Sequence, residues 1–153
     1  EKVIRTLQVG RAPVRPSGTA DGRLMLVPNE GDATVSVVDT TMLQVVATLP
    51  AARGVQAINT GRFESVAFVM SAAERKLVLL DLVKFQGAGG IPLPGRPGPG
   101  VVTSSGDKLY VALTDADKIA VIDVRTRTLA KVIEGVAPRP FGVTMAKTNN
   151  YCH

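Results

Sequence analysis

The sequence is poor in the residues that most reaction centres use. Its 153 residues include one cysteine, Cys152, one histidine, His153, and no tryptophan. A single cysteine excludes an internal disulfide framework and a zinc site built from several thiolates. With His153 as the only histidine, Ser/His/Asp catalysis in its usual form is also excluded. No catalytic residue and no metal ligand is therefore predicted, and a non-enzymatic protein is favoured over an enzyme.

Long apolar runs and dense clusters of positive charge are also missing. The apolar stretches fall well short of the roughly 20 residues that cross a bilayer as a helix, so no membrane span is predicted. The net charge of +5, from 18 basic and 13 acidic side chains, mildly favours an anionic ligand or partner. Two tyrosines and four phenylalanines are too few for a nucleic-acid stacking platform, so no nucleic-acid partner is expected.

What the sequence has in quantity is short apolar segments separated by turn residues. Val, Leu, Ala and Ile occur in brief runs, and 15 glycines and 10 prolines stand largely between them. This pattern is typical of short strands joined by tight turns. The chain length fits a single domain, and a hydrophobic content of 45% is typical of a folded protein.

The apolar segments recur at a fixed spacing of about 42 residues, which is the mark of a repeat architecture. Two anchors carry the repeat: Val35–Asp39, Leu77–Asp81 and Ile119–Asp123, and Leu26–Asn29, Phe68–Ser71 and Tyr110–Leu113. Four-stranded units of about 40 residues are what a propeller blade requires, because each small sheet buries its faces only against neighbouring blades. The sequence therefore predicts an all-β fold, namely a β-propeller segment of three four-stranded blades with flanking half-blade strands.

The third unit shows how the strands are expected to fall. We predict an innermost strand at 100–104, then strands at 108–112 and 118–122 and an outer strand at 129–133. The aspartates that end the third strands are expected to be structural turn residues, each accepting a backbone N–H from two residues further on. These are Asp39, Asp81 and Asp123.

The segments resemble the YVTN-type β-propeller repeat over nearly the whole chain. The matching residues are Gly100-Val101 and Gly142-Val143, Asp21-Gly22, Tyr110-Val111, Val121-Ile122-Asp123, and Gly10 or Gly135. The resemblance implies a periplasmic or extracellular location. It also suggests a scaffold that presents the loops between blades to a ligand or partner.

The repeat divides the chain into an outer strand of a preceding blade, three whole blades, and the start of a further blade. The expected bounds are 1–10, 11–52, 53–94, 95–136 and 137–153. Within the end segments, strands are expected at residues 3–7 and 141–146. Propellers close with about four to eight blades, so we expect the ring to be completed by self-association, by another subunit or by the rest of a longer protein. A start at Glu1 rather than Met is typical of a processed or trimmed chain.

Arginines recur in the connections between blades and are the candidate ligand-binding residues. The set is Arg15, Arg53, Arg96 and Arg139, with Arg11 nearby. These connections belong to one edge of the propeller, so the guanidinium groups are expected to line one mouth of the central channel. There they would hold a carboxylate or phosphate by bidentate hydrogen bonds. The alternative is that these arginines brace the loops by pairing with carbonyls or with acidic residues of neighbouring blades.

Three other features are weaker candidates. Cys152-His153 matches the end of the Cys-x-x-Cys-His motif that attaches haem. Asn149 stands at the position of the first cysteine, so the complete motif is absent. Asp32, Asp115 and Asp117 stand in turns, but one turn offers too few oxygens for calcium. The Gly87–Gly90 segment precedes an expected outer strand at 91–93 and no helix, so it is not a phosphate loop.

These observations favour a non-catalytic binding or assembly scaffold with no cofactor. Two alternatives stay open, since related propellers carry them: a sector of a haem- or quinone-bearing oxidoreductase, and a lactonase-like hydrolase. The second needs acid/base or metal-binding side chains at the channel, which this sequence largely lacks.

Overall fold

The computed structural model describes residues 2–61 and 65–144. This part of the chain consists of strands and turns, and within it no helix is long and apolar enough to cross a bilayer. The strands are β1 (Ser17–Gly18), β2 (Leu24–Asn29), β3 (Thr34–Asp39), β4 (Gln44–Pro50), β5 (Val55–Thr60), β6 (Val66–Ser71), β7 (Lys76–Asp81), β8 (Gln86–Pro92), β9 (Pro97–Val102), β10 (Lys108–Leu113), β11 (Lys118–Asp123) and β12 (Thr128–Ile133).

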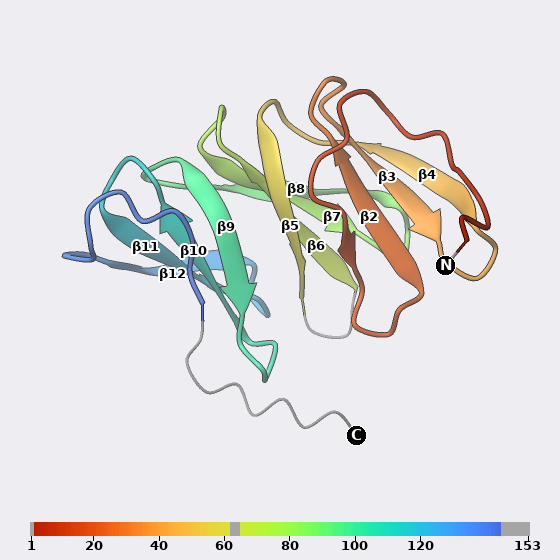
Figure 1. The fold of residues 1–153 in the computed structure, drawn as a ribbon. Coiled ribbons are helices and arrows are strands. Elements are labelled where there is room, and N and C mark those ends of the chain that lie inside the picture. Colours follow the sequence, from red (N-terminus) through yellow and green to blue (C-terminus); the bar gives the residue numbers. More distant parts are fainter. Residues whose placement is uncertain (1, 62–64, 145–153) are drawn as a thin grey trace.

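Consecutive strands pair into three antiparallel sheets of four strands each. The first blade is β1 to β4, the second β5 to β8 and the third β9 to β12. Figure 1 shows the three sheets side by side, in the order of the chain. The second strands begin at Leu24, Val66 and Lys108, which are equally spaced and stand one repeat length apart. The predicted all-β class and the three four-stranded blades are confirmed.

Apolar side chains fill the space between neighbouring blades. Successive residues of a strand point to opposite faces of the sheet, so a strand buried on both faces is a continuous apolar run. In the second blade one set packs on the third blade: Phe68, Met70, Leu77 and Leu79. The alternate set packs on the first blade: Ala67, Val69 and Leu80. Every residue of β6 is buried for this reason.

Each outer strand has an irregularity at the same point of its pairing with the third strand. The register shifts lie at Val37/Val38 in the first blade, Val78/Leu80 in the second and Val121/Ile122 in the third. A bulge increases the local twist and interrupts the straight edge on which further strands would pair. In β8 the shift accommodates Gly89 with a φ of 98°, so the Gly87–Gly90 segment is part of the outer strand and does not precede it.

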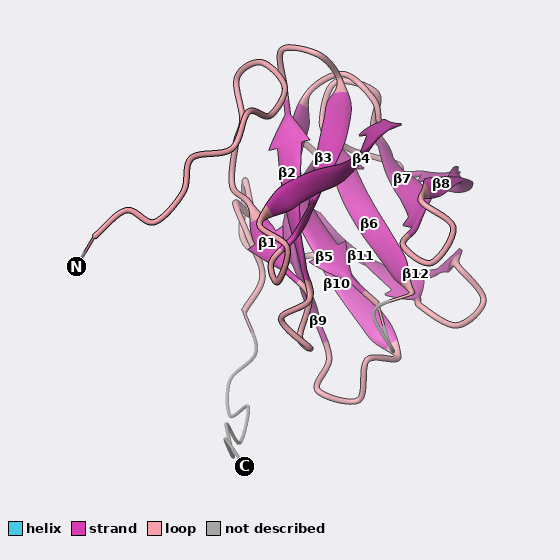
Figure 2. Ribbon diagram, turned by 90° about the vertical axis from the view of Figure 1, so that its right-hand side faces the viewer, coloured by secondary structure: helices cyan, strands magenta, loops and turns pink. Residues whose placement is uncertain are grey.

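The two end segments differ from the prediction. Residues 2–10 form no strand, and the side chains of Val3 and Ile4 are 79% and 83% exposed. Figure 2 shows this segment extending away from the sheets. An outer strand hydrogen-bonds only to the third strand of its own blade. The described residues include no third strand of a preceding blade with which residues 2–10 could pair. Residues 141–144 likewise form no strand, and the rest of the expected strand at 141–146 lies outside the described residues.

The innermost strand of the first blade is also shorter than those of the other two. Only Ser17 and Gly18 pair continuously with β2, while Pro13 forms an isolated bridge with Asn29. Arg15 lies between these points with a φ of 36°, outside the extended region that a strand requires. The chain therefore leaves the sheet at Arg15 and returns at Ser17.

Strands that alternate in direction give every blade two edges of turns. The turns after β2, β6 and β10 lie on one edge together with the connections that lead from one blade to the next. We call this edge the first rim. The turns that precede β2, β6 and β10, and those that follow β3, β7 and β11, lie on the opposite edge, which we call the second rim.

Candidate functional site

Three of the four arginines predicted from the sequence, Arg53, Arg96 and Arg139, lie in the connections of the first rim. In three successive repeats, a carboxylate from the turn after the second strand holds the backbone of a connection. The hydrogen bonds run from the N–H of Arg11 to Asp32 at 2.6 Å, of Arg53 to Glu74 at 2.9 Å, and of Arg96 to Asp115 at 2.7 Å. Charge-assisted bonds of this kind are roughly twice as strong as neutral ones, so they fix the loop backbone under each arginine.

Arg11, Arg53 and Arg96 therefore occupy one repeat position. Arg15 was predicted for this place, with Arg11 only nearby, and that assignment is wrong. The signal that finds Arg11 is its place one repeat length before Arg53. Arg139 continues the series, because it follows Arg96 at close to the same spacing. Its N–H donates to Asp117 Oδ1 at 2.7 Å, in the same turn that holds Arg96.

The side chains of these arginines differ in how far they are engaged. Arg11 Nε lies 2.6 Å from Asp32 Oδ1, and its Nη2 donates to the carbonyl of Gly31, so this guanidinium braces its own loop. Arg53 Nε lies 3.9 Å from Glu74, and its side chain is 84% exposed. The exposed side chains of Arg96 and Arg139 make no ion pair with another described residue.

The carboxylates of the first rim are engaged by cations and by backbone N–H groups. Asp115 also pairs with Arg75 at 3.0 Å, which links the turns of the second and third blades. The N–H of Arg11 and then its side chain lower the pKa of Asp32. The Lys76 ammonium and then the N–H of Arg53 lower the pKa of Glu74.

The acidic residues considered as calcium ligands are likewise held by hydrogen bonds from the first-rim backbone. Asp32, Asp115 and Asp117 each accept a hydrogen bond from an arginine N–H. Among residues 2–61 and 65–144, no cluster of three acidic, histidine or cysteine side chains is arranged to hold a metal ion. Cys152 and His153 lie outside the described residues.

An open hollow of about 260 Å³ lies where the inner segments of the blades converge. Its lining comes from all three blades and from the segment that follows them: Val14, Arg15, Glu30, Val55, Gln56, Pro99 and Phe141. Val14, Gln56, Pro99 and Phe141 stand at or next to one repeat position. This arrangement is expected of the wall of a central channel.

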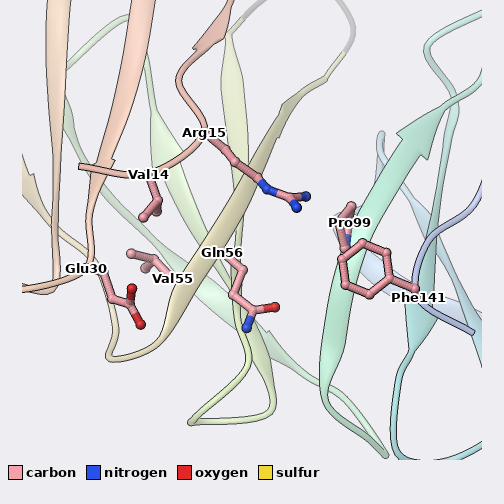
Figure 3. Close-up of a pocket in the computed structure, with 7 residues that line it drawn as sticks. All are labelled: Val14, Arg15, Glu30, Val55, Gln56, Pro99 and Phe141. Carbon is pink, nitrogen blue, oxygen red and sulfur yellow. The ribbon is translucent and has the colours of Figure 1, made fainter. Parts of the chain in front are cut away.

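Arg15 is the member of the predicted arginine set that lines this hollow. Its guanidinium lies 5.7 Å from the centroid of the Phe141 ring, and Figure 3 shows it reaching toward that ring. The hollow also holds the carboxylate of Glu30 and the amide of Gln56 against apolar walls. The structure thus separates the predicted set into one residue at the hollow and three along the rim.

The turn aspartates lie at the other end of the blades, on the second rim. Asp39 Oδ1 accepts the N–H of Thr41, and Asp81 Oδ1 that of Val83, in both cases two residues further on. In the third blade Asp123 Oδ1 accepts the N–H of Thr126, three residues on. The Lys108 ammonium, followed by this N–H, holds the pKa of Asp123 well below its usual range.

Comparisons with known proteins give the fold and no family. No protein-family model matches the chain, and no curated protein matches its sequence. The structure is similar to hydrazine synthase of Kuenenia stuttgartiensis, with a TM-score of 0.80 and 18% identity over 92% of this chain and 42% of that one. It is also similar to the dihydro-heme d1 dehydrogenase NirN, solved in complex with DHE. There the TM-score is 0.68 and the identity 15%, over 84% of this chain and 29% of the other.

These likenesses bear on the fold alone, because the identities are low. The chain spans less than half the length of either protein. Together with the three four-stranded sheets, they identify the chain as a β-propeller segment. The resemblance to the YVTN-type repeat is supported as far as the propeller fold.

Proposed function

We propose that this chain is a non-catalytic β-propeller scaffold whose first rim binds anionic groups of a ligand or partner. The observation that carries the proposal is the contrast between backbone and side chain at Arg53, Arg96 and Arg139. A carboxylate fixes the backbone N–H of each residue, while the guanidinium stays exposed at the rim. Arg15 extends the set toward the central hollow.

The geometry favours a partner with several anionic groups over a single small anion. An exposed ion pair contributes only about 0 to 1 kcal/mol, so one arginine at this rim would bind weakly. Loops that are already fixed lose less conformational entropy when a partner binds, and several such pairs then act together. The guanidinium fork suits carboxylates and phosphates equally, so the class of partner is an acidic protein surface or a polyanion.

The proposal extends to location and assembly. The YVTN-type resemblance supports a periplasmic or extracellular protein. Three blades are fewer than the roughly four to eight of closed propellers, so further blades would complete the ring around the hollow. A second copy of the chain, another subunit or a longer form of this protein would each supply them.

Binding of a polyglutamate peptide and of a linear polyphosphate tests the rim. Replacing Arg96 and Arg139 by Ala should weaken binding of either probe about tenfold or more, since two guanidinium anchors are removed. The free energy of unfolding should change by no more than about 0.5 kcal/mol, because neither guanidinium has an ion-pair partner among the described residues. Isothermal titration calorimetry and denaturant unfolding measure the two quantities.

The matched control removes the same charge elsewhere. Lys84 and Lys131 are exposed and lie away from the first rim, on the second-rim turn and on the outer strand β12. Replacing both by Ala should leave binding nearly unchanged. Equal losses in the two double variants would show general electrostatic attraction and contradict a rim site. A large loss of stability in the arginine variant would favour the bracing role.

A second candidate function is a sector of a cofactor-bearing oxidoreductase. It is favoured by the two similar structures, since one is named a hydrazine synthase and the other a dihydro-heme d1 dehydrogenase. Haem iron is held mostly by histidine or cysteine, and methionine serves as a second ligand beside histidine. Residues 2–61 and 65–144 include methionines but no histidine or cysteine. The described residues therefore fit haem poorly, and its ligands would have to come from elsewhere. A Soret band in the purified protein would support this candidate, and a colourless protein would oppose it.

A further inference from the structure

Two hollows lie at equivalent places on the second rim, each where two blades meet. The hollow between the first and second blades measures about 290 Å³, and the one between the second and third about 230 Å³. The first is lined by Thr19, Asp21, Arg23, Leu24, Leu82, Val83 and Phe85. The second is lined by Ser65, Val66, Gly106, Asp107, Val124, Arg125 and Arg127. The two hollows stand one repeat length apart in the chain. The residues that differ between them can therefore be compared position by position.

The two hollows differ most at two positions of the turn after the third strand. Val83 and Phe85 in the second blade become Arg125 and Arg127 in the third. The two turns share a left-handed residue, since Phe85 and Arg127 have positive φ values of 50° and 58°. Phe85 packs against the apolar core between the first two blades. The apolar ring of Phe85 at the first hollow is thus replaced by the guanidinium of Arg127 at the second.

The two guanidinium groups at the second hollow are available to a ligand. The side chains of Arg125 and Arg127 are exposed, and they form no hydrogen bond or ion pair with another described residue. The pKa of Asp81 is lowered chiefly by the N–H groups of Lys84 and Val83, and the charge of Arg127 adds the smallest contribution. Both arginines are among the residues that line the hollow.

The rest of the lining is apolar apart from Ser65, Gly106 and Asp107. Val66 and Val124 are 3% and 5% exposed and form an apolar floor. Ser65 adds a hydroxyl group and Asp107 a carboxylate. Among the described lining residues, two guanidinium groups stand against one carboxylate, which is an excess of one positive charge. The volume is below the roughly 300 to 1,000 Å³ of sites for drug-sized ligands, which restricts the occupant to a small molecule.

We propose that this hollow binds a small molecule that carries one carboxylate or phosphate group on an apolar body. Arg125 and Arg127 hold the anionic group by charge-assisted hydrogen bonds, and the apolar body lies against Val66 and Val124. This site lies on the opposite rim from Arg53, Arg96 and Arg139. It does not depend on the function proposed for them.

Titration of the 153-residue chain with three probes tests the proposal. The probes are inorganic phosphate, benzoate and phenyl phosphate, followed by calorimetry or by NMR chemical-shift changes. Phenyl phosphate should bind saturably and at least about threefold more tightly than phosphate, because it also buries an apolar ring. The benzoate arm distinguishes a carboxylate from a phosphate as the preferred group.

The informative variant is Arg125→Val with Arg127→Phe, which gives the third blade the residues of the second. The equivalent turn of the second blade already carries Val83 and Phe85, with a positive φ at Phe85 as at Arg127, so the fold should be retained. Binding of phenyl phosphate should weaken at least about tenfold, since the charge-assisted bonds are lost. Replacing Lys131, an exposed cation on the outer strand β12, by Ala should leave it nearly unchanged. If the double variant does not fold, Arg125→Val alone should weaken binding about threefold or more.

Three outcomes would overturn the proposal. They are the absence of saturable binding by the unaltered chain with all three probes, undiminished binding by the double variant, and an equal loss of binding on replacing Lys131. Phosphate binding as tightly as phenyl phosphate would contradict the part of the proposal that concerns the apolar floor.

Discussion

The guanidinium of Arg15 lies 5.7 Å from the centroid of the Phe141 ring, although the two residues are three repeats apart in the sequence. Arg15 belongs to the inner segment of the first blade, and Phe141 follows the third. Both line the hollow at the convergence of the inner segments. Their contact therefore spans the concave side of the three-blade array.

A double-mutant cycle measures this contact. Arg15→Ala, Phe141→Ala and the combined variant should give a coupling energy of about 0.5 to 1 kcal/mol in denaturant unfolding, as for an exposed cation–π pair. Each single variant should be mildly destabilising, because Phe141 is 70% exposed. Additive single effects would show that the two side chains do not interact in solution.

Packing between the second and third blades should dominate stability. Phe68 is fully buried and belongs to the cluster that joins these blades. Phe68→Ala should lower the free energy of unfolding by about 3 to 5 kcal/mol, through lost burial and the cavity left behind. Val83→Ala is the control, since that side chain is 73% exposed and should cost at most about 0.5 kcal/mol. Similar effects in both variants would contradict a stabilising role for the burial of Phe68 between the second and third blades.

The strands of the blades could be predicted because hydrophobic alternation and turn residues are local signals. In the third blade the second, third and outer strands fall within one residue of the expected bounds. The innermost strand was expected at 100–104 but is Pro97–Val102. Proline usually argues against a strand. An innermost strand has one unpaired edge, where a missing N–H costs little, and so it accepts Pro97 and Pro99.

The carboxylates that hold the first rim could not be assigned from local patterns. Asp32 and Arg11 are 21 residues apart, and their pairing depends on how a turn meets a connection in space. The turn positions of Asp32 and Asp115 led only to a weighing of calcium binding and did not identify these residues as partners of the arginines. The regular spacing of Arg11 and Arg53, one repeat length apart, was the available signal for the repeated arginine position. Pairings between residues far apart in the sequence, such as Arg11 with Asp32, can be assigned only after the blades have been positioned in space.

Gly54 is a position where both conformation and space require glycine. Its φ is +66°, and a Cβ there would lie 2.7 Å from the Cβ of Ala73 and 2.9 Å from its backbone nitrogen. Gly54→Ala should therefore destabilise the protein by about 2 to 4 kcal/mol, combining φ strain with overpacking. Gly22→Ala is the matched control. Its φ is +71° with nothing within 4 Å, so only the strain of about 1 kcal/mol applies. Equal melting shifts in the two variants would show that the contact with Ala73 is relieved without cost.

Acid should destabilise the protein through the carboxylates that hold its turns. The pKa of Asp123 is depressed first by the Lys108 ammonium, that of Asp32 by the N–H of Arg11, and that of Asp81 by the N–H of Lys84. A carboxylate with a depressed pKa in the folded state contributes stability above its ordinary pKa of about 4. That contribution is lost as the pH falls through the lowered value, because the folded state must then take up the proton.

Unfolding free energy should thus be nearly constant from about pH 7 to pH 5 and should fall progressively below about pH 4. Asp123→Asn should reduce stability at neutral pH, since the ion pair with Lys108 is lost. It should also flatten the acid limb, because one group with a strongly lowered pKa no longer titrates. Urea unfolding followed across this range measures both effects. An acid limb as steep in the variant as in the unaltered protein would show that Asp123 is not among the groups that link folding to pH.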